Sequence, residues 1–343
     1  MFVDSRTRLG SLYDIGDFLG EGQYASVLEC TRLRDRQQFA LKTIDKARIT
    51  NFPGLRRMST EIEILRKLSS RFVVSLEEVI QTSSRIYIVM EKGGSDLFEF
   101  FGKHPRGVPD EWAKQIISSL IKAVGHIHQN HVCHRDIKPE NVLMNFDMSR
   151  GKCIDLKLCD FGLSAKFKEK VPLSDFCGSP GFFDPEMVME GVHYGDKADI
   201  WSMGCIMLEL MLGHQLFCDH WMISYEHNII KDKGIFSSTM RQTVGNLPNV
   251  LNFTRDFNDF CLKVMVISSN KRMSVLEMAQ HPWLADHNIL PLTPQADRSS
   301  GETNFRPGSS GDFKKACAPS IKNPSKQPSP KAASLFEASK GRK

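Results

Sequence analysis

Two aspartates, each inside its own short motif, are the residues of this chain best suited to catalysis. The stretch His134-Arg135-Asp136-Ile137-Lys138-Pro139-Glu140-Asn141 is followed, 24 residues after its aspartate, by Asp160-Phe161-Gly162. This spacing suits a loop, a short hairpin and a second loop, which would bring one carboxylate near a hydroxyl nucleophile and the other near a metal ion. Phosphoryl transfer needs such a pair, because the protein mainly positions the reactants and neutralises charge on phosphate oxygens.

A glycine-rich turn near the N-terminus could bind the phosphates of a nucleotide. Gly20-Glu21-Gly22 lies between two runs that predict strands, and glycine lets the backbone approach a phosphate without a Cβ in the way. A dinucleotide-binding motif is excluded because no helix is predicted after the turn. A Walker motif is excluded because the pattern G-x-x-x-x-G-K-[ST] does not occur in the chain.

These motifs, together with Phe39-Ala40-Leu41-Lys42, resemble those of the eukaryotic protein kinase superfamily. The lysine two residues after the first aspartate is typical of the serine/threonine type, and the pattern is nearest to the calmodulin-dependent and cyclic-nucleotide-dependent groups. The resemblance covers Tyr13 to Leu284. It departs from the family pattern at Ala25, where a third glycine is usual, and at Asp184, where the family usually has alanine before Pro185-Glu186.

The resemblance implies an ATP-dependent serine/threonine protein kinase that uses Mg²⁺ and transfers the γ-phosphate to protein hydroxyl groups. By this resemblance, Asp136 would orient the attacking hydroxyl and Lys138 would neutralise the transferring phosphate. Asn141 and Asp160 would hold the Mg²⁺ ions that bridge the phosphates. The alternative is a catalytically weak kinase-like scaffold that signals by binding. Such scaffolds usually lack the strand lysine or one of the two aspartates, and all three are present here.

Lys42 is expected to hold the α- and β-phosphates while it pairs with a carboxylate on a predicted helix over residues 55–68. Glu61 and Glu63 are the two candidates. They lie two positions apart, about 200° around a helix, so they cannot both face the lysine. We choose Glu61, because Leu65 then lies four residues further along the same inward face.

The resemblance also places a set of residues around the bound nucleotide. Val27 and Ala40 would cover the adenine from above and Leu143 from below, while Met90 would guard the back of the pocket. The backbone from Glu91 to Gly93 would hydrogen-bond the adenine edge. The full nucleotide-binding set is Gly20, Glu21, Gly22, Val27, Ala40, Lys42, Met90, Glu91, Gly93 and Leu143.

Four residues are predicted to act in regulation: Arg135 of the first motif, and Ser174, Asp175 and Ser179 before the Pro185-Glu186 pair. Asp175 stands where the family usually carries an activating phosphothreonine, and Arg135 is its expected partner. One carboxylate carries less charge than a phosphate, so we expect appreciable basal activity that phosphorylation of the neighbouring Ser174 would raise. Ser179 is predicted to contact the catalytic aspartate and lysine rather than to carry phosphate.

Three further residues are predicted to hold the scaffold together by resemblance to the family. Glu186 is expected to form a buried ion pair with Arg272. Asp199 is expected to tether the catalytic loop from a helix in the core. The histidines and the cysteine between His126 and His134 could instead form a zinc site. It is disfavoured, because two of the histidines are predicted at the end of a helix and the other residues in the catalytic loop.

The hydrophobic pattern predicts an α+β protein with two lobes. Residues 13–44 alternate as three strands, 55–68 have helical spacing, and 73–80 and 85–91 are two further strands. Residues 92–95 break the pattern as a hinge, after which a helix over 109–130 and helical patterns from 197 to 284 dominate. We therefore expect a bilobal protein-kinase-like fold with a small β-rich N-lobe, a larger helical C-lobe and a disordered C-terminal tail.

The expected divisions of the chain are an N-terminal extension (1–12), a kinase domain (13–284) and a basic tail (285–343). Within the domain, the N-lobe covers 13–91, the hinge 92–95 and the C-lobe 96–284. From about Pro291 the composition shifts to Ser, Pro, Lys and Gly, which cannot bury enough surface to offset chain entropy. Residues 295–343 carry ten Lys or Arg against four Asp or Glu, so the net charge of +5 belongs to the tail.

Composition limits the partners and the compartment. The charge balance of the folded part gives no case for nucleic acid. Nine scattered cysteines without a C-x-x-C pair favour a reducing compartment, so we expect the cytoplasm, with the nucleus as the alternative. The first residues show no basic stretch followed by an apolar run, which predicts no signal peptide. The most apolar stretch, Ile200 to Gly213, is too short to span a membrane.

Protein or peptide substrates are expected, and Glu140 favours basic ones. It matches a position that meets a substrate arginine in the cyclic-nucleotide-dependent and calmodulin-dependent groups. A small-molecule substrate is disfavoured, because a long activation segment normally forms a peptide platform. Three tail sites of the form Lys-x-x-Ser suggest autophosphorylation or a pseudosubstrate, although a tail this rich in Lys and Ser also produces them by chance. The sequence predicts neither the oligomeric state nor the physiological substrate.

Overall fold

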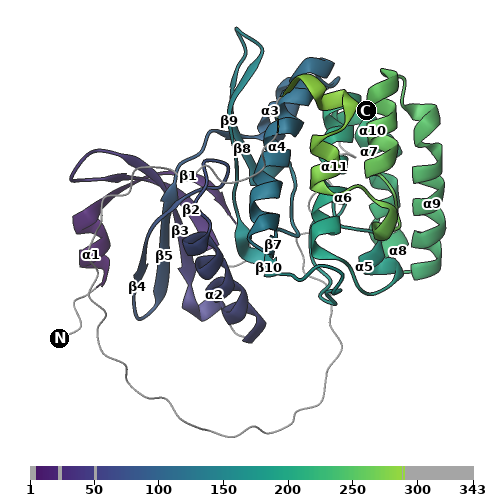
Figure 1. Cartoon of the computed structure of the whole chain (residues 1–343). Helices are drawn as coiled ribbons and strands as arrows, with labels where there is room; N and C mark the ends of the chain where they lie inside the picture. Colours follow the sequence, from purple (N-terminus) through teal and green to yellow (C-terminus); the bar gives the residue numbers. More distant parts are fainter. Residues whose placement is uncertain (1–4, 22–24, 50–51, 288, 290–343) are drawn as a thin grey trace, which may run out of the picture. The chain divides into compact units, whose positions relative to one another are not determined.

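The computed structural model describes residues 5–21, 25–49, 52–287 and 289. Gly22 of the predicted phosphate turn and residues 290–343 of the predicted tail lie outside the described residues. The N-terminal lobe is built on a five-stranded antiparallel sheet (Figure 1). Its strands, in spatial order, are β1 (Tyr13–Glu21), β2 (Ala25–Arg32), β3 (Gln38–Asp45), β5 (Arg85–Glu91) and β4 (Leu76–Gln81).

Side chains on both faces of this sheet are buried along β3 and β5, whereas β1 is mostly exposed. In β3, Phe39 and Leu41 join a small apolar cluster with Leu9 of α1 (Ser5–Leu12), a helix that the sequence analysis did not predict. Ala40 and Ile44 point to the other face and join the main core of the molecule. The sheet therefore turns Lys42 to the same side as Ala40, toward α2 (Phe52–Lys67) and the second lobe.

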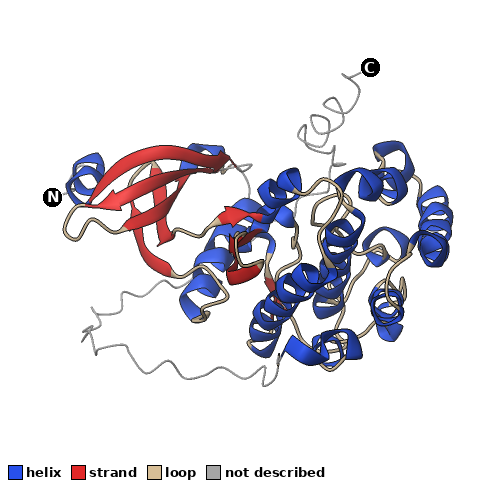
Figure 2. Cartoon of the chain, turned by 90° about the horizontal axis from the view of Figure 1, so that it is seen from above, coloured by secondary structure: helices blue, strands red, loops and turns tan. Residues whose placement is uncertain are grey.

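A helical lobe follows the sheet, and seen from above most helices lie together on the side away from the five-stranded sheet (Figure 2). Its centre is α6 (Gly195–Leu212), in which nearly every side chain is buried because α4 (Asp110–Gln129), α7 (His214–His220) and α10 (Arg255–Val264) pack around it. The remaining helices of this lobe are α3 (Leu97–Lys103), α5 (Glu186–Met189), α8 (His227–Ile230), α9 (Lys233–Val250) and α11 (Val275–Ala279).

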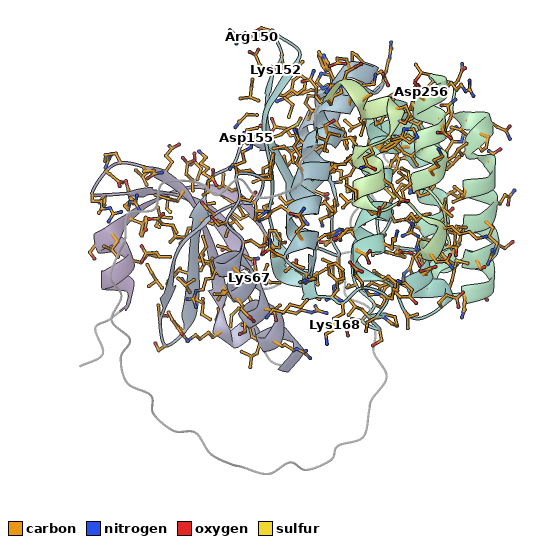
Figure 3. All side chains as sticks on the ribbon, in the orientation of Figure 1. Lys67, Arg150, Lys152, Asp155, Lys168 and Asp256 are labelled. Carbon is orange, nitrogen blue, oxygen red and sulfur yellow. The ribbon has the colours of Figure 1, made fainter. Side chains whose placement is uncertain are left out.

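A hairpin of β8 (Val142–Asp147) and β9 (Lys152–Leu158) joins the two aspartate motifs. At its base Val142 pairs with Leu158, and β6 (Ser95–Asp96) extends the ladder on the other side of β8. The hairpin projects from the body of the lobe, with Arg150 and Lys152 at its far end (Figure 3). A second, two-stranded ladder of β7 (Val132–Cys133) and β10 (Ala165–Lys166) lies beside the catalytic loop.

The prediction of an α+β protein with two lobes is confirmed. The predicted helices over 55–68 and 109–130 correspond to α2 and α4, and the predicted strands over 73–80 and 85–91 correspond to β4 and β5. Within the part of the chain that the structure describes, no helix is both long and apolar enough to cross a membrane.

Candidate active site

Lys42 sits at the centre of a three-residue charge cluster that joins the sheet, α2 and the loop after β9. Its Nζ donates to Glu61 Oε1 at 2.5 Å and to Asp160 Oδ1 at 2.9 Å. Glu61 is 4% exposed, whereas Glu63 lies outside this cluster and pairs with Lys166. The choice of Glu61 over Glu63 as the partner of Lys42 is therefore correct, and it follows from the inward face of α2.

The positive charge of Lys42 and the two carboxylates beside it stabilise one another. Burial alone would lower the pKa of Lys42, but the carboxylates of Glu61 and Asp160 raise it well above its usual range. Lys42 in turn lowers the pKa of Asp160 to about 2, against the opposing effect of burial. Burial raises the pKa of Glu61, and Lys42 opposes that shift. Asp160 is therefore a carboxylate across the whole physiological pH range.

Asp136 is held from three sides at the mouth of the catalytic loop. Ser179 Oγ donates to Asp136 Oδ1 at 2.8 Å, and Asn141 Nδ2 lies 3.3 Å from Oδ2. Lys138 Nζ lies 3.7 Å from Oδ2 and donates to Ser179 Oγ at 3.0 Å. Burial raises the pKa of Asp136, while Lys138 and the Ser179 hydroxyl lower it. The predicted contact of Ser179 with both catalytic side chains is thus present.

The catalytic loop is fixed from below by Asp199, a fully buried residue of α6. Its carboxylate accepts from the backbone nitrogens of His134 and Arg135 at 2.9 and 2.8 Å. It also lies 2.8 Å from His128 Nε2 at the end of α4. Arg135 has a φ of 66°, in the left-handed region, so these bonds hold a strained backbone in place. The predicted tether from α6 to the catalytic loop is present.

The residues proposed for Mg²⁺ lie at the two ends of the hairpin base. Asn141 directly precedes β8, and its backbone oxygen accepts from Cys159 N at 3.0 Å beside Asp160. Asn141 Nδ2 donates to the backbone oxygen of Asp136, so its side-chain oxygen is the atom that a cation could bind. The carboxylate of Asp160 is half-exposed and ionised. One carboxylate and one amide oxygen suit Mg²⁺, which completes its shell with phosphate oxygens and water.

The alternative zinc site is not formed. Within the described ranges, no group of three or more His, Cys, Asp and Glu side chains is placed to hold a metal ion by itself. His128 faces Asp199, and His134 Nε2 lies 3.0 Å from the backbone oxygen of Cys159. These imidazoles position the loop.

The predicted nucleotide pocket has its walls on the two lobes. Val27 pairs with Lys42 across β2 and β3, and Ala40 pairs with Met90 across β3 and β5, so these side chains share one face of the sheet. Leu143 of β8 lies directly against Gly93, because a Cβ on Gly93 would lie 2.5 Å from Leu143 Cδ1.

The remaining pocket residues have structural partners of their own. Gly20 and Glu21 end β1, directly before residues 22–24, which lie outside the described residues, and Arg48 Nη1 lies 3.9 Å from Glu21 Oε1. Glu91 donates its backbone N–H to Ser75 O at 2.9 Å, and its carboxylate pairs with Lys157 at 3.0 Å. These contacts fix the strand that leads into the hinge.

Comparison with known proteins places this geometry in a family. A model of the protein kinase domain matches residues 13–284. The chain belongs to the protein kinase family. It is similar to serine/threonine kinases in particular: a probable serine/threonine-protein kinase of Dictyostelium discoideum is 30% identical over 84% of this chain.

Two further relatives support the same assignment. The maternal embryonic leucine zipper kinase of Xenopus tropicalis is 31% identical over 86% of this chain. A SNF1-related protein kinase catalytic subunit alpha of Arabidopsis thaliana is 34% identical over 82% of it. The chain spans 40%, 42% and 52% of the lengths of these three relatives.

The activation segment of this kinase domain runs from Asp160 to Glu186. Near its middle, Asp175 Oδ2 lies 3.6 Å from Arg135 Nη1, which is the pair that the sequence predicted. Arg135 is buried, and Nη1 has no hydrogen-bond partner, because 3.6 Å is too long for one. The Asp175 side chain is 79% exposed, and Ser174 beside it is exposed as well. The pair is therefore loose.

The prediction that Glu186 forms a buried ion pair with Arg272 is wrong. Asp184 takes the guanidinium instead: Arg272 Nη1 lies 2.5 Å from Asp184 Oδ2, and Nη2 lies 3.4 Å from Oδ1. Both side chains are fully buried. Glu186 is half-buried, and its Oε1 accepts from Ser269 N at 2.8 Å. Asp184, at the position where the family usually has alanine, places a carboxylate in a site that excludes water. Such a carboxylate needs a cation as its partner, and Arg272 provides it.

Sequence reasoning also missed an aromatic cradle beneath the end of the activation segment. Trp221 Nε1 donates to Gly181 O at 2.9 Å, and the Tyr225 hydroxyl donates to Phe183 O at 3.0 Å. Trp201 Nε1 donates in turn to the Tyr225 hydroxyl. One signal was available for Trp201, because an aromatic residue with a polar atom inside the apolar stretch from Ile200 to Gly213 needs a hydrogen-bond partner when buried.

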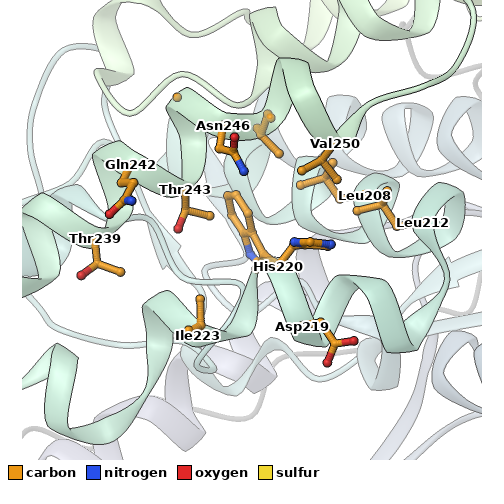
Figure 4. Close-up of a pocket in the computed structure, with 13 residues that line it drawn as sticks. Leu208, Leu212, Asp219, His220, Ile223, Thr239, Gln242, Thr243, Asn246 and Val250 are labelled. Atoms are coloured by element: carbon orange, nitrogen blue, oxygen red, sulfur yellow. The ribbon is translucent and has the colours of Figure 1, made fainter.

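One cradle residue, Trp221, also lines a cavity of about 650 Å³ between α6, α7 and α9 (Figure 4). The same side chain binds the activation segment through Gly181 O. None of the predicted catalytic or nucleotide-binding residues lines the cavity. Its other lining residues are Leu208, Leu212, Asp219, His220, Ile223, Thr239, Gln242, Thr243, Gly245, Asn246, Leu247 and Val250.

Proposed function

We propose that this chain is an ATP- and Mg²⁺-dependent serine/threonine protein kinase that transfers the γ-phosphate to protein hydroxyl groups. The observation that carries the proposal is the bridge from Lys42 to both Glu61 and Asp160, formed while Asp136 is held by Ser179 and Asn141. The groups that would hold phosphates, metal and nucleophile are therefore positioned together. A kinase-like scaffold has no need of this arrangement.

The residues divide the reaction between them. Lys42 presents a positive charge that the α- and β-phosphates can share with Glu61. Asp160 and Asn141 would supply the oxygens that hold Mg²⁺, and the ion would neutralise charge on the phosphates. Asp136 accepts the hydrogen bond of the substrate hydroxyl and takes its proton as the bond to phosphorus forms. Lys138, 3.7 Å from that carboxylate, stabilises the charge on the transferring group.

We further propose that substrates are protein segments with basic residues before the phosphoacceptor. Glu140 lies in the catalytic loop and is exposed, so its carboxylate is available to an arginine or lysine of the substrate. A reducing compartment such as the cytoplasm fits the eight cysteines that the structure describes, all of which are free.

The experiment is transfer of labelled phosphate from ATP to a basic peptide, compared between the wild type and Asp136→Asn. Removal of a general base costs about 10²- to 10⁴-fold in rate, so the variant should lose nearly all activity. Asp256→Asn, an exposed aspartate on α10, is the matched control and should keep full activity. A wild type that binds ATP but transfers no phosphate to basic, neutral or acidic peptides would favour the scaffold instead.

A further inference from the structure

A chain of three side chains joins a buried carboxylate at the end of α6 to a half-buried thiol on α7. Glu209 lies in the last turn of α6, and His214 and Cys218 lie one turn apart on α7. Gly213 makes the sharp bend between the helices with a φ of 80°, and a Cβ there would lie 2.5 Å from the backbone of Arg106. This bend folds His214 back over the end of α6.

The histidine contacts both neighbours, one through each ring nitrogen. His214 Nδ1 lies 2.7 Å from Glu209 Oε1, and His214 Nε2 lies 3.6 Å from Cys218 Sγ. The spacing of four residues on α7 places the imidazole and the thiol on the same face. A thiol, an imidazole and a carboxylate in this order are the parts of an activated nucleophile, in which the acid orients the base.

Both neighbours of His214, Cys218 and Glu209, favour the charged form of its imidazole. The Glu209 side chain is 2% exposed, and Oε2 has no hydrogen-bond partner. A buried carboxylate needs a cation nearby, and His214 is its partner in the structure. Contacts with Cys218 and Glu209 raise the pKa of His214 to about 10, so the imidazole is protonated at neutral pH. From α3, only the ring of Phe98 stacks against it, edge-on at 6.1 Å, among the described contacts.

We propose that Cys218 is an activated nucleophile and a site of covalent modification by small electrophiles and low-molecular-weight disulfides. The His214 imidazolium, 3.6 Å from the sulfur, offers a positive charge to the attacking sulfur, and the partial exposure of Cys218 admits the reagent. The arrangement is not a metal site, because the structure shows no metal-binding group of three His, Cys, Asp or Glu side chains among the residues it describes.

Among the cysteines that the structure describes, two other half-buried thiols provide the contrast. Cys153 Sγ faces the backbone oxygen of Asp155 at 3.7 Å, and Cys159 Sγ faces the backbone oxygen of Glu140 at 4.0 Å. Burial raises the pKa of Cys153 to about 11 and raises that of Cys159 further. Neither thiol has a cation as its hydrogen-bond partner, so both should react slowly.

Each modification needs only the Cys218 thiolate and the added reagent. With iodoacetamide, the Cys218 thiolate attacks the methylene carbon, a C–S bond forms, the C–I bond breaks and iodide leaves with the electron pair. With an oxidised glutathione molecule, the thiolate attacks one sulfur, a new S–S bond forms and the old one breaks. The departing glutathione thiolate then takes a proton from solvent.

The test is the rate of iodoacetamide labelling at each cysteine of the full folded chain at pH 7, measured by peptide mass spectrometry. Cys153 is the internal reference, since it is half-buried like Cys218. We expect Cys218 to be labelled roughly tenfold faster or more, because the reaction depends on the thiolate fraction. Equal rates at the two thiols in the wild type would overturn the proposal.

Two variants separate activation from simple exposure. His214→Gln should slow labelling of Cys218 about tenfold while the rate at Cys153 stays unchanged. Glu209→Gln keeps a side chain of the same shape but removes the charge, and it should slow Cys218 by a smaller factor. If His214→Gln leaves the Cys218 rate unchanged in a sample whose Cys153 rate matches the wild type, the imidazole does not activate the thiol and the proposal fails.

Discussion

The activation segment is held by two aspartate–arginine pairs that differ in nearly every physical respect. Asp184 and Arg272 are both fully buried and meet through two contacts, of 2.5 and 3.4 Å. Arg272 also donates to the backbone oxygens of Val266 and Ile267. Asp175 and Arg135 meet at 3.6 Å, with the aspartate 79% exposed. One end of the segment is therefore fixed to the core of the helical lobe, whereas its middle is held by a contact that water and salt can weaken.

The buried pair should show the largest effect. Asp184→Ala leaves the Arg272 guanidinium without its carboxylate in a dry site, which costs about 3–5 kcal/mol in the free energy of unfolding. Denaturant unfolding measures this loss. Glu186→Ala removes one half-buried acceptor from Ser269 N and should cost only about 1–2 kcal/mol. A larger loss for Glu186→Ala than for Asp184→Ala would show that the usual pair of the family forms in solution.

A pH effect should arise from His193, which is fully buried near both pairs and has no hydrogen-bond partner on either ring nitrogen. Burial and then the charge of Arg135 lower its pKa to about 4, so the folded protein keeps it neutral. The unfolded chain takes up the proton near pH 6.5, so stability is lost as the pH falls from about 6.5 to 4.

The loss through His193 should reach roughly 2–3 kcal/mol by pH 4.5. Denaturant unfolding of the wild type and of His193→Asn at pH 7 and pH 4.5 isolates the contribution of His193 to the free energy of unfolding, because the two proteins share all other titrating groups. An identical pH dependence in the two proteins would show that the imidazole is not kept neutral by the fold.

The loose pair should respond to phosphorylation next to it. Arg135 Nη1 is buried without a hydrogen-bond partner, so a phosphate on Ser174 could supply the acceptor that Asp175 reaches only at 3.6 Å. One new charge-assisted hydrogen bond corresponds to roughly a tenfold change in an equilibrium. We expect phosphatase-treated wild type to keep basal activity and to gain about tenfold on phosphorylation, while Ser174→Ala stays at the basal level. An inactive dephosphorylated enzyme would contradict the first expectation.

The smallest effect should come from the loose pair itself. Asp175→Asn should change the free energy of unfolding by about 0–1 kcal/mol, as expected for an exposed ion pair. Any loss of peptide phosphorylation should shrink when the salt concentration rises from about 0.1 M to about 1 M, since the screening length falls from about 10 Å to about 3 Å. A salt-independent loss would mean that Asp175 acts by packing.

The catalytic cluster was predictable because each contact depended on a short spacing. The helical periodicity of residues 55–68 selected Glu61 over Glu63, and the two loops at the base of one hairpin brought Asn141 and Asp160 together. The fold was predictable to the same degree, since strand alternation and helix periodicity are local signals.

The buried end of the activation segment was not predictable in the same way. The partner of Arg272 depends on which of two acidic residues, two positions apart, reaches the core, and the family pattern pointed to the wrong one. The departure at Asp184 was visible in the sequence, but its consequence depends on the packing of Trp201, whose ring lies 4.9 Å from the guanidinium. Contacts between segments nearly 90 residues apart are set by the whole lobe.

The hairpin of β8 and β9 has a consequence for engineering. Its base fixes the separation of Asn141 and Asp160 through the pairing of Val142 with Leu158, whereas its tip at Arg150 projects away from the body of the lobe (Figure 3). A change of length at the tip leaves the pairing of Val142 with Leu158 intact, because the exposed residues 148–150 lie beyond the last pair of the ladder, Asp147 with Lys152. The tip is therefore a place where an epitope or a fluorescent peptide can be inserted while the spacing of the metal ligands is preserved.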